Sequence, residues 1–236
     1  MALRQVNPLM MSERRLQVKY SVEFAKDVAE ASGRVQVESI EFLGRGEDSE
    51  AFAINRDLVL KLPKSRKASD RLRTEMRVLR ALGRDMPLRI PEVLFDGMFP
   101  AVLGGHSDGS DADGEYAYSV CTRVQGRSLA KPEFLTLDED IRSKNAEIVA
   151  NFLRCLHARR DVLLVKRRDL ALLHGDFSLN HVVFDDFGCV CGILDFADCR
   201  VGKPKSDFVY LLDDEDEEEF GAAFGMMVLD LYGRCR

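Results

Sequence analysis

Short segments in the first half of the chain alternate apolar and polar residues, the pattern of strands with one buried face. A glycine-containing turn at 44–49 joins the first two of these segments. Short turns between consecutive strands favour antiparallel pairing, so the pattern predicts an antiparallel sheet. Its strands are expected at 35–43, 51–54, 58–63 and 116–124, with a further pair beginning at 90–95.

Three longer segments carry apolar residues at helical spacing. The first covers residues 12–31 and ends before Gly33, and the second runs from about 69 to 83. The third begins at Thr136, an N-cap candidate followed by acids, and His157 ends its inner face as a packing residue. The predicted inner faces comprise Val18, Val22, Phe24, Ala25, Val28 and Ala29, then Leu72, Met76, Leu79 and Leu82, then Ile141, Ile148, Val149, Phe152, Leu153 and Leu156.

Two short apolar runs, 181–184 and 190–194, flank an Asp-Asp-Phe-Gly turn. An Asp-rich turn that ends in Gly is a hairpin signal. The predicted hairpin carries Asp176 and His181 at its entry and Asp195 at its exit. Oxygen-rich and imidazole side chains at one end of a hairpin suit a phosphate-bound magnesium ion, which needs only a few protein ligands.

The spacing of these residues is typical of phosphoryl transfer. Kinases use an Asp that orients the hydroxyl, a metal ligand a few residues later, and a second Asp after a hairpin. Counting five residues from Asp176 reaches His181, which we prefer as the metal ligand over Asn180, and Asp195 stands in the last place. The alternative is an ordinary hairpin with surface acids.

A second group of candidate residues belongs to the predicted sheet and its helix. The strand–Gly44-x-Gly46–strand pattern predicts a loop that can lie over nucleotide phosphates, although a tight hairpin without a ligand would look the same. Lys61 is embedded in an apolar strand, where its charge is costly to desolvate without a phosphate or carboxylate partner. We predict that Glu75 is that partner; the alternative is a lysine that reaches solvent and an exposed glutamate.

Composition limits the classes of function. The 236 residues are 46% hydrophobic and 31% charged, as in globular proteins. The net charge of −6 and the pI of 5.4 argue against nucleic acid as the main partner and are compatible with a cationic one. We expect no membrane span and no signal peptide. Six cysteines without framework spacing indicate reduced thiols, and we expect a cytoplasmic protein.

Seven consecutive acids follow an apolar run, at 213–219. Two interpretations remain open. The acids can form a solvated helix start, where the helix dipole favours negative charge. Alternatively, they form a cation-binding wall beside the phosphoryl-transfer site. One exposed pair contributes only ~1 kcal/mol in water, but several acids that face a polyamine would act together.

Six segments together carry a family resemblance that covers most of the chain from about residue 35. They are IEFLGRGEDS at 40–49, LKLPK at 60–64, IPEV at 90–93, HGDFSLNH at 174–181, GILDFAD at 192–198 and DFVYLL at 207–212. With them the chain resembles the aminoglycoside 2''-phosphotransferases, which have a protein-kinase-like fold. The resemblance implies an α+β fold with two lobes. The N-lobe, 1–126, would hold an antiparallel sheet with a helix, and 127–236 would form a shortened, mostly helical C-lobe.

The resemblance also implies roles for the candidate side chains. Asp176 would position the 2''-hydroxyl of the drug, and His181 and Asp195 would hold magnesium, with Asn180 as second choice. Lys61, supported by Glu75, would hold the phosphates of ATP or GTP. The other assignments are Gly44, Gly46 and Ser49 for the γ-phosphate, Cys121, Thr122 and Val124 for the purine, and Asp198, Asp213, Asp214, Glu217 and Glu218 for the aminoglycoside.

The chain departs from this family in length. Only about sixteen residues, 158–173, separate the helix that ends near His157 from the His-Gly-Asp motif, and family members continue beyond residue 236. We therefore expect an aminoglycoside O-phosphotransferase, a resistance enzyme, with a pared-down acceptor half. The alternatives are a nucleotide-binding protein without acceptor turnover, or a small-molecule kinase for another hydroxyl or amine substrate.

Overall fold

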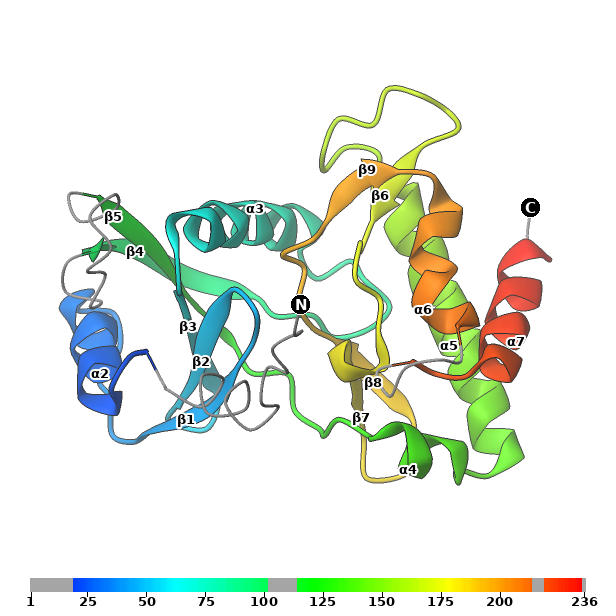
Figure 1. The fold of residues 1–236 in the computed structure, drawn as a ribbon, viewed down its shortest axis with the longest axis horizontal. Coiled ribbons are helices and arrows are strands. Elements are labelled where there is room, and N and C mark those ends of the chain that lie inside the picture. The colour runs from blue at the N-terminus through cyan, green and yellow to red at the C-terminus, as the bar shows by residue number, and fades with distance from the viewer. Residues whose placement is uncertain (1–18, 102–113, 214–218, 235–236) are drawn as a thin grey trace, which may run out of the picture. The chain divides into compact units, whose positions relative to one another are not determined.

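The computed structural model describes residues 19–101, 114–213 and 219–234. Figure 1 shows its strands and helices in chain order. The strands and helices fall into two compact units, which are described separately. One unit comprises Met1–Ser69 and Asp96–Val120, and the other comprises Asp70–Phe95 and Cys121–Arg236.

The predicted boundary between the lobes differs from this grouping. We expected one division after residue 126, whereas residues 70–95 and 121–126 group with the C-terminal unit. The physical reason lies in helix α3 (Arg66–Leu82), because its residues Val78 and Leu82 are fully buried in the hydrophobic core of that unit. The lobe boundary as such stays a prediction.

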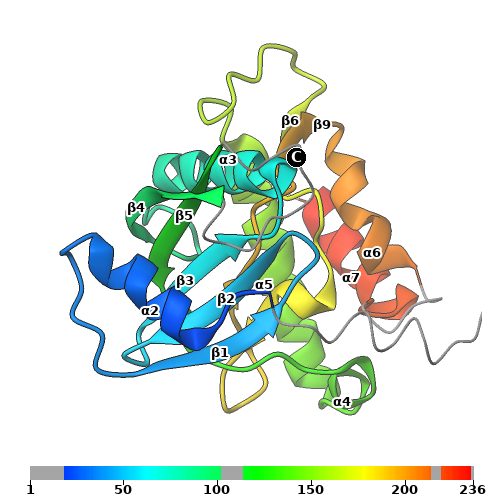
Figure 2. The ribbon, with the colours of Figure 1, turned by 60° about the vertical axis from the view of Figure 1, so that its left-hand side comes forward.

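The predicted antiparallel sheet is present, with five strands in the order β1-β2-β3-β5-β4. β1 pairs antiparallel with β2, and β2 with β3. Helix α2 (Val22–Ala31) packs beside β1 and β3 (Figure 2). The strands are β1 (Ile40–Arg45), β2 (Ser49–Ile54), β3 (Leu58–Pro63), β4 (Val93–Pro100) and β5 (Glu115–Thr122).

Two predicted boundaries in this unit were wrong. The first strand begins at Ile40 rather than at 35, because Asn55 Oδ1 accepts hydrogen bonds from the N–H groups of Glu38 (2.8 Å) and Ser39 (3.0 Å). The side chain of Asn55 thus accepts the hydrogen bonds that these backbone N–H groups would otherwise donate to a neighbouring strand. Helix α2 begins at Val22 after the N-cap Ser21, and part of the predicted range, 12–18, lies outside the described residues.

The C-terminal unit is mostly helical, as predicted. Besides α3 it contains two small antiparallel sheets, of which the β6–β9 pair was not predicted. A three-residue strand carries too short a pattern to be recognised alone. The elements are α4 (Lys131–Leu135), α5 (Glu139–Ala158), β6 (Ala171–Leu173), η2 (Leu179–His181), β7 (Val182–Phe184), β8 (Val190–Ile193), β9 (Arg200–Gly202), η3 (Pro204–Phe208), α6 (Val209–Leu212) and α7 (Ala222–Gly233).

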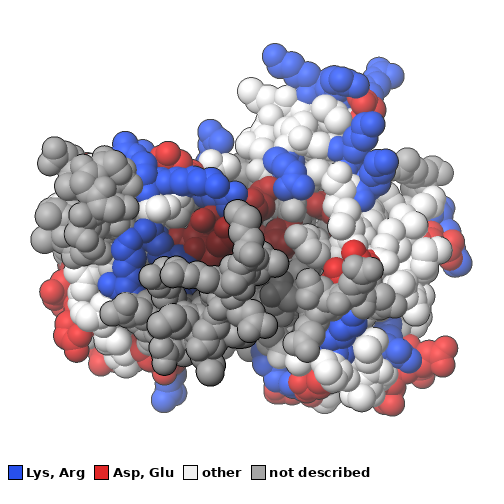
Figure 3. Space-filling view, viewed as in Figure 1, with Lys and Arg blue, Asp and Glu red and all other residues white. Residues whose placement is uncertain are grey.

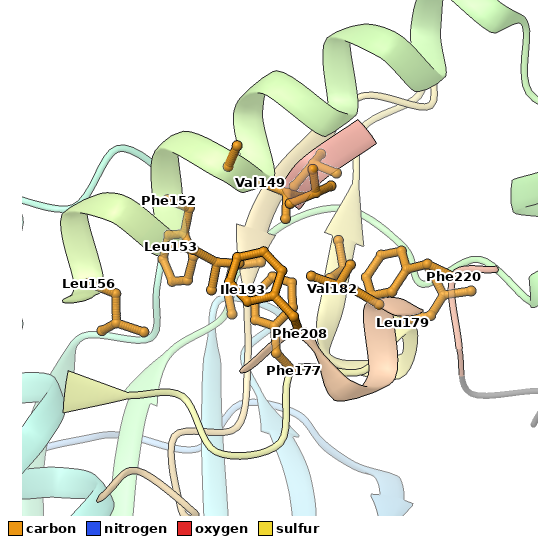
Figure 4. Packing of buried hydrophobic residues seen from close by; sticks show 14 of the residues in the cluster. Val149, Phe152, Leu153, Leu156, Phe177, Leu179, Val182, Ile193, Phe208 and Phe220 are labelled. Carbon is orange, nitrogen blue, oxygen red and sulfur yellow. The ribbon is translucent and has the colours of Figure 1, made fainter. Parts of the chain in front are cut away.

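A continuous hydrophobic core fills the C-terminal unit (Figure 4). The inner face of α5 supplies Phe152 and Leu153, which pack with Phe177 and Val182 from the neighbourhood of the His-Gly-Asp motif. Burying each such side chain contributes about 1.5–3 kcal/mol. The motif is therefore anchored by apolar neighbours on both sides, while the side chain of Asp176 stays partly exposed.

One predicted helix start in this unit was also wrong, and the described ends of the acidic run do not fit one of its two open interpretations. α5 begins at Glu139 and not at Thr136, which instead ends the short helix α4 and donates its hydroxyl to Glu133 O (2.7 Å). The acidic run does not start a helix where the structure describes it. Asp213 is the C-cap of α6, and Glu219, only 5% exposed, precedes α7.

Basic side chains gather over the segment between α5 and β6 (Figure 3). One of them, Arg159, donates hydrogen bonds to the last carbonyls of α3, those of Ala81 (2.6 Å) and Leu82 (3.0 Å). A cation suits a helix C-terminus, where carbonyls lack partners. No helix in the described ranges has the length and apolarity that crossing a membrane would need.

Substituting Gly225 by Ala is expected to destabilise the fold by about 1–3 kcal/mol, the usual cost of overpacking. A Cβ atom at Gly225 in α7 would lie far inside van der Waals contact with the backbone of Leu211 in α6, and backbone cannot move aside cheaply. Urea unfolding measures the loss. Gly233→Ala is the control, because a Cβ there meets nothing within 4 Å; equal losses in both variants would contradict the packing argument.

Candidate active site

The predicted hairpin is present and is fixed at its turn. β7 and β8 pair antiparallel, with Val182 opposite Ile193. At the turn, Asp185 Oδ1 accepts hydrogen bonds from the N–H groups of Phe187 (2.9 Å) and Cys189 (2.8 Å). This bonding is the reason that Asp is favoured at the start of such turns. The hairpin therefore holds the segments before and after it at a fixed separation.

A buried amide ties the hairpin to α5. Asn145 Nδ2 donates to Gly188 O (2.9 Å), and its Oδ1 accepts from Val190 N (2.9 Å). The residue is fully buried, so both hydrogen bonds are needed to offset its desolvation. We did not single it out, because the sequence does not show which amide of a helix faces a distant turn.

Asp176, His181 and Asp195 converge, as predicted. His181 Nε2 lies 3.6 Å from Asp195 Oδ2, and His181 Nδ1 lies 2.8 Å from the backbone oxygen of Asp176 and 3.6 Å from its Oδ2. The side chains of Asp176, His181 and Asp195 are 33%, 20% and 42% exposed, so a ligand can reach all three. Asn180, the second choice as metal ligand, is exposed in the same short helix η2.

The donor chemistry of His181 fits a magnesium ligand. A carbonyl only accepts, so Nδ1 carries the proton toward Asp176 O, and Nε2 keeps its lone pair in the neutral ring. The 3.6 Å between Nε2 and Asp195 Oδ2 is close to the ~3 Å between adjacent ligands of octahedral Mg²⁺. Within the described residues no three His, Cys, Asp or Glu side chains form a metal site, so phosphates and water would complete the shell.

The backbone of Asp195 is left-handed, with φ of 59°. Non-glycine residues rarely adopt this conformation, although Asp and Asn tolerate it best. The residue before it is fixed, because Leu194 N donates to His181 O (2.8 Å). Strained backbone of this kind occurs preferentially at functional sites. Here it turns the carboxylate of Asp195 toward His181.

The backbone of the His-Gly-Asp motif is held by Asp207. Its Oδ2 accepts from His174 N (2.9 Å) and its Oδ1 from Gly175 N (2.9 Å), while His157 Nε2 lies 3.0 Å from Oδ2. Burial by itself would raise the pKa of Asp207, but the hydrogen bonds from His157 and Gly175 and the nearby imidazoles outweigh it and hold that pKa below its ordinary value. Asp207 is therefore a buried carboxylate that fixes the loop carrying Asp176.

His174 links the same loop to the segment before Asp195. Its Nε2 donates to Leu194 O (3.0 Å), and the ring is completely buried with Nδ1 unbonded. Burial lowers the pKa of His174, so the imidazole is neutral at pH 7. The segments that carry the two acids are thus joined directly, which the sequence motif alone did not indicate.

Two arginines contact Asp198, Arg200 at its backbone oxygen and Arg71 at its carboxylate. Arg200 donates to Gly175 O (3.0 Å) and Asp198 O (3.3 Å), and Arg71 lies 3.6 Å from Asp198 Oδ1. Gly175 has a φ of 92°, and a Cβ there would clash with the Asp198 backbone, so only glycine fits. The predicted contact between Asp198 and an aminoglycoside stays a prediction. Its carboxylate already faces an arginine.

In the N-terminal unit, the glycine loop is open. A Cβ at Gly44 would meet nothing within 4 Å in the described structure, and one at Gly46 would make only ordinary contact with Ser49 O. Packing does not require glycine at these positions, whereas close approach of a ligand would. Lys64 Nζ donates to Gly46 O (2.5 Å), which steadies the loop.

Lys61 and Glu75 belong to different units, so their predicted pairing stays a prediction. Lys61 lies in β3 opposite Ala51 of β2 and is half-buried. Glu75 lies in α3 and is only 3% exposed, which contradicts the alternative of a solvent-facing glutamate. A buried carboxylate of this kind requires a polar or cationic partner.

The residues predicted to contact the purine, Cys121, Thr122 and Val124, lie at the end of β5 and just after it. Cys121 is buried, while Thr122 Oγ1 accepts from Glu92 N (2.9 Å) and Thr122 N donates to Glu92 O (2.9 Å). Thr122 and Val124 line a cavity of about 510 Å³ in the C-terminal unit, together with apolar residues such as Leu88. The contact with a purine stays a prediction.

The predicted acidic wall is described only in part. Asp213 is half-buried, and Asp214, Glu217 and Glu218 lie outside the described residues. Glu219 is buried and therefore does not belong to a solvated surface, contrary to the first interpretation of the run. The assignment of the other acids to a cationic substrate stays a prediction.

The free energy of unfolding is expected to depend on pH through Asp207. Because its pKa is lower in the folded than in the unfolded chain, its contribution is complete above the unfolded value of about 3.9 and is lost as the pH falls through the folded value. The difference in stability between the wild type and Asp207→Asn should therefore shrink as the pH falls below about 4. Urea unfolding at pH 7, 5, 4 and 3 checks this, and a constant difference would contradict it.

Comparison with known proteins gives one family. The model of the "Phosphotransferase enzyme family" matches residues 39–165 and 159–236. The ternary complex of streptomycin, ATP and APH(2'')-IIa is a similar solved structure, with a TM-score of 0.72 and 20% identity over 93% of this chain and 84% of that chain.

Two further structures extend the comparison. The complex of APH(2'')-IIIa with GDP and kanamycin has a TM-score of 0.73 and 22% identity over 92% of this chain and 84% of that chain. Macrolide 2'-phosphotransferase MphH from Brachybacterium faecium has a TM-score of 0.57 and 14% identity over 86% of this chain and 80% of that chain. These matches confirm the predicted kinase-like α+β fold.

Proposed function

Because this chain belongs to the phosphotransferase enzyme family, we propose that it transfers the γ-phosphoryl group of ATP or GTP to a hydroxyl of an aminoglycoside antibiotic. The observation that carries the proposal is the convergence of Asp176, His181 and Asp195 within one unit. Similar structures in complex with streptomycin and ATP, or with kanamycin and GDP, support this class of substrate. The activity would confer drug resistance.

Asp176 orients the acceptor hydroxyl rather than deprotonating it beforehand. Carboxylates in general are far weaker bases than the alkoxide of a sugar hydroxyl and do not remove its proton beforehand. It can accept a hydrogen bond from that hydroxyl and take the proton as the bond to phosphorus forms. Asp207 holds the backbone just before Asp176, and His174 links it to the segment just before Asp195. This rigidity favours positioning as the main contribution of Asp176 to catalysis.

His181, or Asn180 as second choice, and Asp195 would hold Mg²⁺, which when bound neutralises negative charge on the phosphates. Lys61, supported by Glu75, binds the phosphates of the nucleotide, and the backbone of the open Gly44–Gly46 loop approaches the γ-phosphate with Ser49. Residues 121–124 contact the purine through their backbone. Such contacts do not distinguish ATP from GTP, and either serves as co-substrate.

The acceptor is proposed to be cationic. The net charge of −6 and the acids Asp198 and Asp213, with Asp214, Glu217 and Glu218, supply negative charge for a polyamine substrate. Nucleic acid and membranes are not proposed as partners. We propose a cytoplasmic location, where nucleotide is available and thiols stay reduced, since the described cysteines are free.

Mass spectrometry of the drug tests the function. The protein is incubated with ATP or GTP, Mg²⁺ and a panel of aminoglycosides, with a macrolide included. Phosphorylated aminoglycoside is the expected product. Nucleotide binding without any product would favour a binding protein without acceptor turnover, and product only with unrelated alcohols or amines would favour a different small-molecule kinase; either result would overturn the proposal.

A further inference from the structure

A chain of buried polar groups connects the C-terminal helix to the His-Gly-Asp motif. The hydroxyl of Tyr232 in α7 lies 2.9 Å from His157 Nδ1, and His157 Nε2 at the end of α5 lies 3.0 Å from Asp207 Oδ2. Asp207 in turn accepts from the N–H groups of His174 and Gly175, both at 2.9 Å. Helix α7 is thereby connected to the loop that presents Asp176.

The direction of these hydrogen bonds follows from the donor inventory. A carboxylate only accepts, so Nε2 of His157 carries a proton toward Asp207. A hydroxyl can donate or accept, so Tyr232 can partner Nδ1 whether or not that nitrogen carries a proton. His157, Asp207 and Tyr232 are 7%, 1% and 9% exposed, so little solvent is available to replace a lost partner. We had interpreted His157 as a packing residue, and the structure adds a polar role.

We propose that His157, oriented by Tyr232, is a positioning residue for phosphoryl transfer: it fixes the carboxylate of Asp207, and with it the backbone that aims Asp176. The inference rests on the proposed function. It follows from geometry, because Asp207 uses Oδ2 for both His157 and His174 N and Oδ1 for Gly175 N. Without His157 the carboxylate keeps only the two backbone donors and can rotate together with them.

Such rotation of the Asp207 carboxylate would displace Asp176. Gly175, whose N–H is held by Asp207, directly precedes Asp176, so a shift of the 174–175 peptide changes the position of the Asp176 backbone. A small misplacement of a catalytic group costs about 100-fold in rate. Substrate binding does not depend on this alignment to the same degree, so kcat should fall while KM changes little.

The surroundings of His157 permit a chemical-rescue experiment. His157 and Tyr232 line a cavity of about 300 Å³, through which a small molecule can reach the space that a truncated residue leaves. In His157→Ala we expect kcat to fall about 10- to 100-fold, with KM for nucleotide changed by less than about 3-fold. In alkaline buffer, where both compounds are neutral, imidazole should restore about 10-fold of this loss, whereas 1-methylimidazole, whose neutral form has no N–H to donate to Asp207, should not.

Matched variants separate positioning from general stability. Tyr232→Phe removes only the hydroxyl and should lower kcat about 2- to 5-fold, since one neutral hydrogen bond is lost. Arg154→Ala also removes a contact between α5 and α7, the hydrogen bond to Leu231 O (2.8 Å), but it does not touch Asp207 and should leave kcat within about 2-fold. His157→Phe keeps the ring volume and should still lose activity.

Amide hydrogen exchange provides a readout that does not need turnover. The amides of His174 and Gly175 should exchange faster in His157→Ala and regain protection with imidazole. If the wild type forms no product while these amides respond as expected, the proposed function fails and the positioning of the loop stands. If the wild type is active and His157→Ala matches it in kcat, or loses kcat without rescue and without faster exchange, the inference is overturned.

Discussion

Asp176→Asn is expected to lower kcat for drug phosphorylation by about 1,000-fold, within the range of 10²–10⁴ for loss of a positioned acid–base group. The amide keeps the shape of the side chain, but it can no longer take the proton of the acceptor hydroxyl. The neighbouring backbone should stay in place, because the hydrogen bonds of Ser178 N and His181 Nδ1 go to the backbone oxygen of Asp176, while the carboxylate lies 3.6 Å from His181 Nδ1. Nucleotide affinity should therefore stay within about 3-fold, since the hydrogen bonds that hold this turn do not use the carboxylate of Asp176.

Steady-state kinetics and nucleotide titration of the same preparation check this result. Asp186→Asn is the matched control, because Asp186 is an exposed acid at the tip of the same hairpin and contacts none of the candidate residues in the described structure. It should keep wild-type kcat. If both variants kept full activity, Asp176 would have no role in the reaction.

Asp195→Asn is expected to lower kcat by a similar factor, about 1,000-fold, and to make activity depend on much higher Mg²⁺ concentrations. A metal ion supplies several kcal/mol of charge stabilisation, and about 1.4 kcal/mol corresponds to tenfold in rate. Asn tolerates the left-handed backbone at this position (φ of 59°) and can still accept from Ala197 N. The substitution therefore removes the charge and leaves the fold.

Titration of activity with Mg²⁺ distinguishes loss of a metal ligand from loss of structure. A ligand variant should recover part of its activity as the metal concentration rises, whereas a misfolded one should not. Asp195→Gly is the second variant, because glycine relieves the backbone strain while it deletes the carboxylate. If Asp195→Gly is at least as thermally stable as the wild type and still inactive, the loss of activity comes from the missing metal ligand and not from unfolding. Wild-type Mg²⁺ dependence in both variants would contradict the assignment.

Local patterns in the sequence predicted the parts that are local in the structure. The strand alternation placed β2, β3 and β5 within a few residues, and the Asp-Asp-Phe-Gly turn located the hairpin between β7 and β8. The spacing from Asp176 to His181 also predicted their convergence, because both lie in one short turn and its 3₁₀ helix. In each case hydrogen bonds between near neighbours determine the geometry.

Errors arose where a distant side chain determines the backbone. Asn55 holds residues 38 and 39 out of the sheet, so the predicted strand at 35–43 starts late. Thr136 looks like an N-cap, yet it ends the preceding helix α4. The burial of Glu219 contradicts, at one end of the acidic run, the solvated helix start that was one of two open interpretations. Asn55 lies 17 residues from Glu38, beyond the window that a strand pattern uses, whereas Thr136 bonds to nearby Glu133 and shows that one local signal fits two different roles.

The sequence by itself determined the strand pattern, the hairpin and the spacing of the residues that converge there, because periodicity and turn chemistry act over a few residues. The fold class came from the family resemblance of its motifs. Only the tertiary structure decided how those acids are held. His157, His174 and Asp207 lie up to 50 residues apart and meet in the buried interior, where each must find a hydrogen-bonding partner. The sequence identifies the functional side chains of the loop that carries Asp176, whereas the rigidity of that loop comes from groups that the fold brings together.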